Sequence, residues 1–269
     1  MRLKTRLVLM ACCLFAGCSS AASVTTDPNA LAAGSTVTTL AAGKLNTLPT
    51  GNVFVRVREF DQPATYTFLS VQHVPGFVYV ETGLHRLTLE GQAPIYIPAG
   101  SARFHTSISH THFNPGPGLS TWYFVAVWSR SSPGLPPPAP YAKDDYESTD
   151  FTPAQMPPGA YSQVLRQVSL VPGGRSEAHR FGGLTLFFVL KGSLAIGTDK
   201  GVIELRAHHG LALLPGLALQ ERDQATGPCV YLEMLTTLSG QDFEIPLLSP
   251  PKGSTQPSLR TLLSSASAT

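Results

Sequence analysis

The sequence predicts an all-β protein. Its 269 residues are 43% hydrophobic and only 13% charged, and they include 24 Gly and 23 Pro, a composition that favours many turns over long helices. Apolar and polar residues alternate in Val53–Arg58 and again in His85–Glu90, which is the period of half-buried strands. No segment carries a sustained helical moment, so any helix should be short.

The N-terminus has the organisation of an export signal. A basic region with Arg2 and Arg6 precedes a short apolar stretch over Leu7–Phe15, and two small residues come before Cys18. This ending resembles the bacterial lipobox, in which the cysteine becomes the lipidated first residue of the mature protein. The resemblance predicts a membrane anchor on Cys18, and Ser19 after it suggests the outer membrane facing the periplasm. An ordinary cleaved signal peptide is the alternative.

Composition divides the rest of the chain into segments. The region after the signal is rich in Ala, Thr and Ser, which is typical of a flexible tether. Eight prolines lie between Ser131 and Pro158, and they oppose sheet pairing. The predicted order is a signal peptide (1–17), a tether (18–49), a first barrel (50–130), a Pro-rich linker (131–158), a second barrel (159–240) and a C-terminal tail (241–269).

Cysteine and charge counts exclude two classes of protein. Two of the four cysteines leave with the signal and Cys18 would carry lipid, so Cys229 has no partner within the mature chain and a disulfide scaffold is excluded. Cys229 lies in an apolar run, which is typical of a small buried residue rather than a reactive thiol. Removing Arg2, Lys4 and Arg6 changes the net charge from +2 to −1 (+2 − 3), so nucleic-acid binding is not expected.

The two halves share landmarks. The apolar run Phe77–Gly83 resembles Phe187–Gly192, since each ends in a glycine turn, and Ile95–Gly100 resembles Leu211–Gly216, since each ends in a Pro-Gly turn.

These landmarks resemble the motifs of the cupin superfamily. The first cupin motif is a glycine, five residues, His-x-His, three or four residues, Glu, six residues and glycine. In the second half Gly173, His179, Phe181, Thr185 and Gly192 keep this spacing, but only His179 keeps the ligand chemistry. The second motif fits Gly210–Gln220 loosely and places Gln220 about where its histidine would be. The resemblance implies two cupin-like (double-stranded β-helix or jelly-roll) barrels joined by the Pro-rich linker.

The first half departs further from the cupin pattern. Counting back from Gly83 puts Gly76 at the Glu position, and Gln72 and Ser70 at the two His positions. In the second motif Arg103 stands at the His position. By this count the first half keeps no metal ligand.

The resemblance places a ligand site in the second barrel. Alternate residues of a closed sheet point inward, so Glu177, His179 and Phe181 would share one face. A transition-metal site needs about three converging protein ligands, which this face does not supply, so no cofactor is predicted. A divalent metal held by His179 with Glu177 is the alternative. The predicted ligand-binding residues are His179, Phe181, Thr185, Gln220, Glu177 and Arg103.

The remaining histidines are predicted to be structural. His110 and His112 lie two residues apart, so on a strand both imidazoles share a face that can chelate, with His105 on the opposite face if that strand is unbroken. A solvent-facing strand is favoured, because the sequence places no third ligand beside them. His208 and His209 precede a turn glycine and are expected at the surface.

Two functions follow from this pattern. Retained spacing with lost ligands favours a cell-envelope lipoprotein that binds a small molecule, or has a structural role, without a metal. The alternative is a metal-dependent cupin enzyme, a dioxygenase or isomerase, with an atypical site around His179.

Overall fold

The structure is a computed structural model. It describes residues 33–70, 73–106, 108–137 and 140–255. The predicted signal peptide, the lipidation site Cys18 and the motif position Gln72 lie outside the described residues. No described helix is long and apolar enough to cross a membrane.

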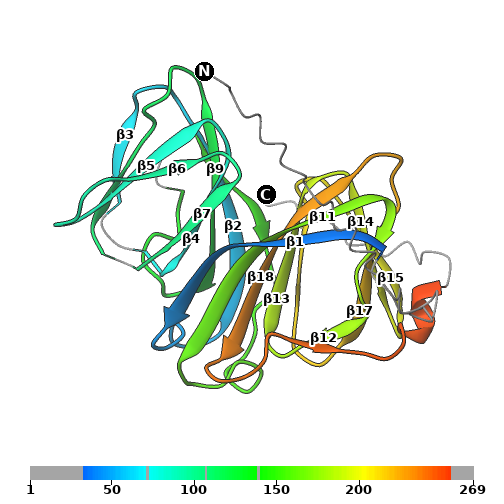
Figure 1. Cartoon of the computed structure of the whole chain (residues 1–269). Helices are drawn as coiled ribbons and strands as arrows, with labels where there is room; N and C mark the ends of the chain where they lie inside the picture. Colours follow the sequence, from blue (N-terminus) through cyan, green and yellow to red (C-terminus); the bar gives the residue numbers. More distant parts are fainter. Residues whose placement is uncertain (1–32, 71–72, 107, 138–139, 256–269) are drawn as a thin grey trace, which may run out of the picture.

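The described chain is all-β, as the sequence predicts, with one 3₁₀ helix, η1, at Lys252–Thr255 and no α-helix. Strands of the first half form two sheets, and those of the second half form one larger sheet joined by β1 (Figure 1). The five-stranded sheet of the first half has the order β10-β2-β9-β4-β7 and its four-stranded sheet the order β3-β8-β5-β6. The ten-stranded sheet runs β15-β14-β17-β11-β18-β13-β16, with β1 beside β11 and β12 beside β17 and β19.

The first-half strands are β2 (Val53–Gln62), β3 (Thr67–Ser70), β4 (Gly76–Thr82), β5 (Leu84–Leu89), β6 (Ile95–Pro98), β7 (Ser101–His105), β8 (His110–Phe113), β9 (Ser120–Ser129) and β10 (Ala142–Glu147). The ten-stranded sheet contains β1 (Ala33–Leu45), β11 (Tyr161–Arg175), β12 (His179–Phe181), β13 (Leu184–Lys191), β14 (Ser193–Thr198), β15 (Gly201–Arg206), β16 (Gly210–Leu213), β17 (Ala218–Asp223), β18 (Cys229–Leu238) and β19 (Glu244–Pro246).

The two halves repeat one pattern of strand pairing. In the first half β4 pairs with β7 and β9, and β5 pairs with β6 and β8; in the second half β13 pairs with β16 and β18, and β14 pairs with β15 and β17. Gly83 and Gly192 join the equivalent hairpins, both with positive φ (79° and 84°). A Cβ at either position would lie within 3.0 Å of a backbone oxygen, so only glycine fits the turn.

The predicted repeat is displaced at its second landmark. Pro98-Ala99-Gly100 connects β6 to β7, whereas Pro215-Gly216 connects β16 to β17, one strand later in the pattern. The equivalent of the Pro215-Gly216 turn is therefore the connection between β7 and β8. This displacement matters because β8, rather than β7, is the counterpart of β17.

The flexible-tether prediction is wrong for Ala33–Leu45, which forms β1 and pairs antiparallel with β11 along most of its length. β1 needs no apolar stripe of its own, since β11 supplies an edge with free backbone groups. Figure 1 shows β1 beside β11, running across the molecule with its arrow toward the first-half sheets.

The Pro-rich linker also contains a strand. Ala142–Glu147 forms β10 beside β2, where two ion pairs hold it: Arg56 binds Glu147 at 2.6 Å and Arg58 binds Asp144 at 2.6 Å. The linker is therefore in part a fixed element of the first half.

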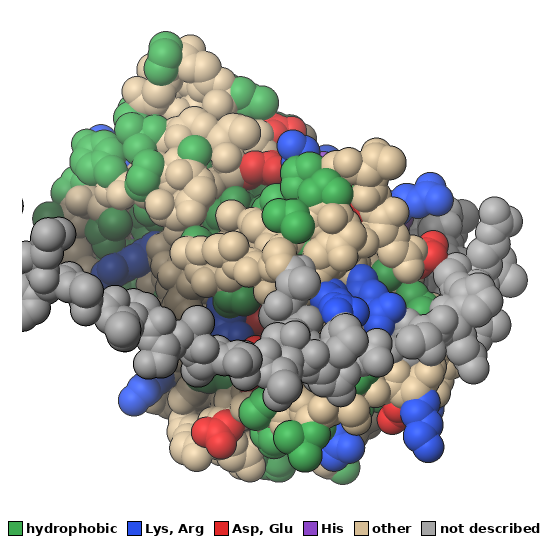
Figure 2. Space-filling model, turned by 45° about the vertical axis from the view of Figure 1, so that its right-hand side comes forward, with side chains coloured by type: hydrophobic (Ala, Val, Ile, Leu, Met, Phe, Trp, Pro, Cys, Tyr) green, Lys and Arg blue, Asp and Glu red, His purple; other side chains and the backbone are tan. Residues whose placement is uncertain are grey.

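One apolar cluster joins the halves, with Val55, Tyr79 and Tyr123 from the first half packed with Leu186 and Phe188 from the second. A further cluster fills the interior of each half. At the surface, hydrophobic side chains gather in the upper part of Figure 2, which the first half occupies, and Lys and Arg are more frequent below. The exposed large apolar residues of the first half are Tyr66, Leu69, Tyr96, Ile108 and Leu119.

Candidate metal centre

Five buried histidines converge inside the first half. They are His73 before β4, His85 on β5, His105 at the end of β7, and His110 and His112 on β8, and each is at most 8% exposed. We call this group the histidine nest. The prediction that His110 and His112 lie on a solvent-facing strand is therefore wrong.

Two features bring the nest together: the alternation of side chains along β8, and the interruption between strands β7 and β8. Burial alternates along β8, so His110 and His112 point inward together, where they lie opposite Leu89 and Leu87 of β5. The strand that carries His105 ends before β8 begins. An unbroken strand would put His105 on the opposite face, but the break brings its ring to 4.6 Å from the ring of His110.

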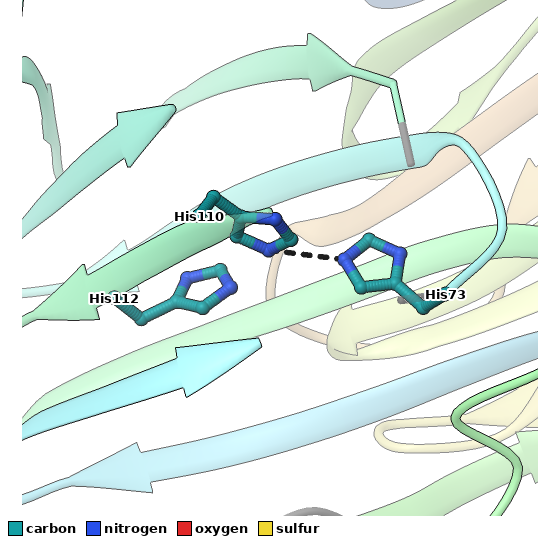
Figure 3. Close-up of side chains that lie close together, drawn as sticks. All are labelled: His73, His110 and His112. Carbon is teal, nitrogen blue, oxygen red and sulfur yellow. Dashed lines mark hydrogen bonds between the residues drawn. The ribbon is translucent and has the colours of Figure 1, made fainter. Parts of the chain in front are cut away.

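The imidazole nitrogens are close enough to share an ion. His73, His110 and His112 each offer a nitrogen, and these atoms lie within 4.8 Å of one another (Figure 3). The Nε2 atoms of His73 and His110 are 3.0 Å apart. Two ligands of a tetrahedral zinc, each about 2.0–2.1 Å from the metal, lie about 3.4 Å apart, which is close to this separation.

Backbone carbonyls fix the tautomers of three rings. Nδ1 of His73 donates to the oxygen of Val74 at 2.5 Å, and Nδ1 of His110 donates to that of Ile108 at 2.6 Å. With Nδ1 protonated, Nε2 of each neutral ring carries a lone pair, so two acceptors face each other at 3.0 Å. That arrangement is stable only if a proton or a metal cation lies between the two nitrogens.

The other three rings complete the nest. His105 donates from Nδ1 to the oxygen of Thr106 at 2.9 Å, which leaves its buried Nε2 without a hydrogen-bond partner. Nδ1 of His112 lies 2.9 Å from Nε2 of His85. If His112 donates in this pair, its own Nε2 is a free acceptor, and His85 becomes the outer partner that orients a ligating ring.

Burial keeps the nest uncharged. It lowers the pKa of His73 to about 4 and the pKa of His85 and of His105 to about 3. It also lowers the pKa of His110, and that of His112 falls well below the ordinary value. Since the members are all imidazoles, each further proton would also be repelled by its neighbours. All five rings are therefore neutral near pH 7, the form that binds metals.

The nest opens on an apolar cavity of about 450 Å³. His73 and His112 form part of its wall, and Leu69, which is 62% exposed, lies at its rim. Trp122 stacks on His112 with ring centres 4.7 Å apart and on Phe60 at 3.9 Å. The other lining residues are Arg58, Phe68, Phe124, Trp128, Pro133, Gly134, Pro136 and Pro137.

Arg58 fastens the Pro-rich connector over this cavity. Its guanidinium donates to the backbone oxygens of Gly134, Leu135 and Pro136 at 3.0, 2.5 and 3.2 Å, and to the Asp144 carboxylate at 2.6 Å. The Arg58 guanidinium is thus already bound by three backbone oxygens and one carboxylate, so its role is to hold the cavity wall in place.

The predicted site around His179 has a different composition. His179 is buried on β12, with its Nδ1 donating to the backbone oxygen of Glu177 at 2.9 Å and its Nε2 lying 3.4 Å from Oε1 of Glu221. The side chain of Glu177 is exposed. The nearest carboxylate to His179 is therefore Glu221, with Glu244 at 4.0 Å, and Glu177 contributes its main chain.

The motif count missed Glu221 by one residue. Gln220 donates to the backbone oxygen of Ser176 at 2.9 Å, whereas the next residue along β17 faces His179. Ser176 also donates to Glu221. Burial is the largest single influence and lowers the pKa of His179, but Glu221, the backbone oxygen of Glu177 and Glu244 together outweigh it and raise that pKa to about 9.

Three other predicted residues are placed as follows. The ring of Phe181 packs edge-on against His179 with centres 4.4 Å apart. Thr185 is buried and donates to the oxygen of Gly183, and Arg103 is exposed on β7. A cavity of about 390 Å³ lies beside His179, lined also by Ser35, Val37, Ser176, Glu177, Glu244 and Pro246.

Cys229 is free and buried, as the sequence predicts.

One feature of the sequence marks the nest. Of the eight histidines in the chain, five lie between residues 73 and 112, a density that no motif spacing takes into account.

Comparisons with known proteins show a likeness of fold alone. No family model matches the sequence, and no curated protein matches it. Among solved structures, a single-site mutant of Bacillus subtilis oxalate decarboxylase is 11% identical, with a TM-score of 0.51 over 74% of this chain and 72% of that one. The Lactobacillus farciminis oxalate decarboxylase formate complex is 10% identical, with a TM-score of 0.51 over 78% and 88%. At these identities the likeness concerns the fold alone.

Proposed function

We propose that the chain is a metal-dependent cupin enzyme whose metal is held by the histidine nest and whose substrate is a small, mainly apolar molecule bound in the adjoining cavity. One observation carries the proposal: the buried Nε2 acceptors of His73 and His110 face each other at 3.0 Å, with no donor between them. His112 is the third ligand, and the unpartnered Nε2 of His105 is the candidate fourth.

The donor set favours particular metals. Neutral imidazoles suit Zn²⁺, Cu²⁺, Fe²⁺ or Ni²⁺ better than Mg²⁺ or Ca²⁺, which prefer oxygen ligands. Because the ligands are uncharged, the site keeps the full positive charge of the ion. When bound, a divalent metal supplies a Lewis acid that polarises an oxygen of the substrate.

The protein's own residues determine which substrate fits. Trp122, Phe124 and Trp128 give the cavity aromatic walls that exclude water and pack against flat apolar groups. Among the described lining residues Arg58 is the one permanent cation, and Asp144 and three carbonyls already bind it. A doubly charged substrate such as oxalate would find no free cationic partner in this wall, so we propose a substrate with one coordinating oxygen on an apolar body.

Metal binding can be tested through the protein's own fluorescence. The chain has two tryptophans, Trp122 and Trp128, and both line the cavity. We expect Cu²⁺ or Ni²⁺ to quench their emission and to bind with one equivalent per chain at the nest. His110→Ala should weaken this binding by about 100-fold or more, and His85→Phe, which removes the outer partner, by about 10- to 100-fold.

The matched control is His209→Ala, which removes an exposed histidine far from the tryptophans in sequence and sheet. It should leave both the affinity and the quenching unchanged. Equal affinities for the His110→Ala variant and the unaltered chain would contradict the proposal, as would metal binding without any quenching.

A second candidate function rests on the cavity beside His179. Its lining combines the imidazole with Glu244 and Ser176, so it suits a small polar molecule bound without a metal. This keeps the non-metal binding role that the sequence favours, but confines it to the second half.

We also propose that the protein is exported and anchored in the cell envelope through a lipid on Cys18. The support is the signal pattern of the first 18 residues.

A further inference from the structure

We infer that the seam between the two halves contains a second divalent-metal site, formed by Glu59, Asp145 and His208. Glu59 lies on β2 and Asp145 on β10, both in the first half, whereas His208 follows β15 in the second half. Each offers one ligand atom, and these atoms lie within 4.8 Å of one another. We call this group the seam site.

The distances suit one small ion. Nδ1 of His208 lies 3.5 Å from Oδ2 of Asp145 and 3.7 Å from Oε2 of Glu59. These separations are slightly longer than the spacing of about 3.4 Å between ligands of a tetrahedral zinc, so a small inward movement would complete the coordination.

The two carboxylates are in excess of the cations that face them. Their side chains are 6% and 9% exposed, and Oδ2 of Asp145 has no hydrogen-bond partner. Among the described residues Lys143 is the one ammonium beside them, 2.8 Å from Glu59 and 3.5 Å from Asp145, and Tyr123 donates to Glu59 at 3.1 Å. Two buried negative charges with one positive charge leave a net negative site, which a divalent cation would neutralise.

The position of His208 is set by the main chain. Its backbone N–H donates to the oxygen of Val189 at 2.7 Å, and its φ is 61°, in the left-handed region. The imidazole of an otherwise exposed turn is thereby held over the carboxylates of the other half.

The chemistry differs from that of the nest. Two carboxylates and one imidazole form a site of mixed oxygen and nitrogen ligands that suits Zn²⁺ or Mn²⁺, and a metal there would link the two halves. Lys143 competes with the metal for the same oxygens. Its side chain is 61% exposed and can swing into solvent when the metal enters.

Zn²⁺ competition against a chromophoric chelator, with the full chain, tests the inference. His208→Asn removes the imidazole while keeping a residue that tolerates the left-handed turn, and it should weaken one Zn²⁺ site by at least about 10-fold. Asp145→Asn should do the same. Lys143→Met should strengthen that site several-fold, because the competing ammonium is gone. His209→Asn, an exposed neighbour, is the matched control and should change nothing.

The seam site can be tested independently of metal binding at the histidine nest. In the His110→Ala background, the Zn²⁺ that remains should still respond to His208→Asn and to Lys143→Met. The inference is overturned if His208→Asn binds as much Zn²⁺, and as tightly, as its parent, or if Lys143→Met weakens binding. Loss of Zn²⁺ only on His110→Ala would support the nest and reject the seam site.

Discussion

The two halves of the chain have the same strand pattern but opposite electrostatics at equivalent positions. His112 lies opposite Leu87, four residues after the hairpin glycine Gly83, and Glu221 lies opposite Ile196, four residues after Gly192. One equivalent inward position therefore carries an imidazole in the first half and a carboxylate in the second.

That exchange decides the charge of the buried histidines. In the nest, imidazoles surround imidazoles, so burial prevails and the pKa of His85 and of His105 falls to about 3. Beside Glu221, burial is outweighed and the pKa of His179 rises to about 9. A buried histidine is thus a neutral metal ligand or a fixed cation depending on its partner. The first half is therefore suited to holding a metal, and the second to holding an ion pair.

The largest expected effect is a loss of stability in acid, which comes from the histidine nest of the first half. The nest imidazoles have folded-state pKa values below the unfolded value of about 6.5, so the unfolded chain binds more protons and stability falls as the pH falls below about 6.5. His73, His85 and His105 together should cost about 4 kcal/mol per pH unit, at about 1.4 kcal/mol each, down to a pH of about 4. His179 contributes a nearly constant amount below about pH 6.5, since its imidazole is protonated there in both the folded and the unfolded chain.

Denaturant unfolding followed by tryptophan fluorescence between pH 7 and pH 5 measures this slope, because both tryptophans lie beside the nest. His85→Phe should reduce the slope by about 1.4 kcal/mol per pH unit, whereas His209→Phe should not alter it. A flat stability profile across this range would show that the nest is charged or hydrated in the folded protein.

The next effect concerns the ion pair of the second half. His179→Ala leaves Glu221 buried without its cation and should lower the free energy of unfolding by about 3–5 kcal/mol. Glu221→Gln removes the other partner and should cost a similar amount. The double variant should cost less than the sum of the two, since each single change removes the same pair. Additive costs, measured by denaturant unfolding of all four proteins, would mean that the two side chains are not coupled.

Much of the fold follows from the sequence, and the residues that were missed show where spacing arguments fail. Alternation and the glycine turns predicted the all-β class and the equivalent hairpins at Gly83 and Gly192. Motif counting then selected Gln220, which is buried and binds the backbone oxygen of Ser176, whereas the next residue on β17, Glu221, faces His179. Because side chains alternate across a strand, a slip of one residue exchanges the inward and outward faces.

Two other features were not predictable from local sequence. The convergence of His105 with His110 depends on a break between β7 and β8, which periodicity does not place. β1 has the composition of a tether and becomes a strand only because β11 offers it an edge. Both features are set by tertiary contacts.

The smallest expected effect is a loss of stability in alkali, which comes from His179 of the second half. The pKa of His179 is raised to about 9 in the folded state against about 6.5 unfolded, so its contribution to stability is full below about pH 6.5 and is lost as the pH rises through 9. Between pH 7.5 and pH 9.5 the loss should be about 2 kcal/mol. Glu221→Gln should remove most of this pH dependence, whereas His85→Phe should leave it intact, because the nest is neutral throughout the range. If the profile above pH 7.5 is unchanged by Glu221→Gln, the charge on His179 has another origin than its carboxylate neighbour, and the contrast between the two halves does not rest on the exchange of His112 for Glu221.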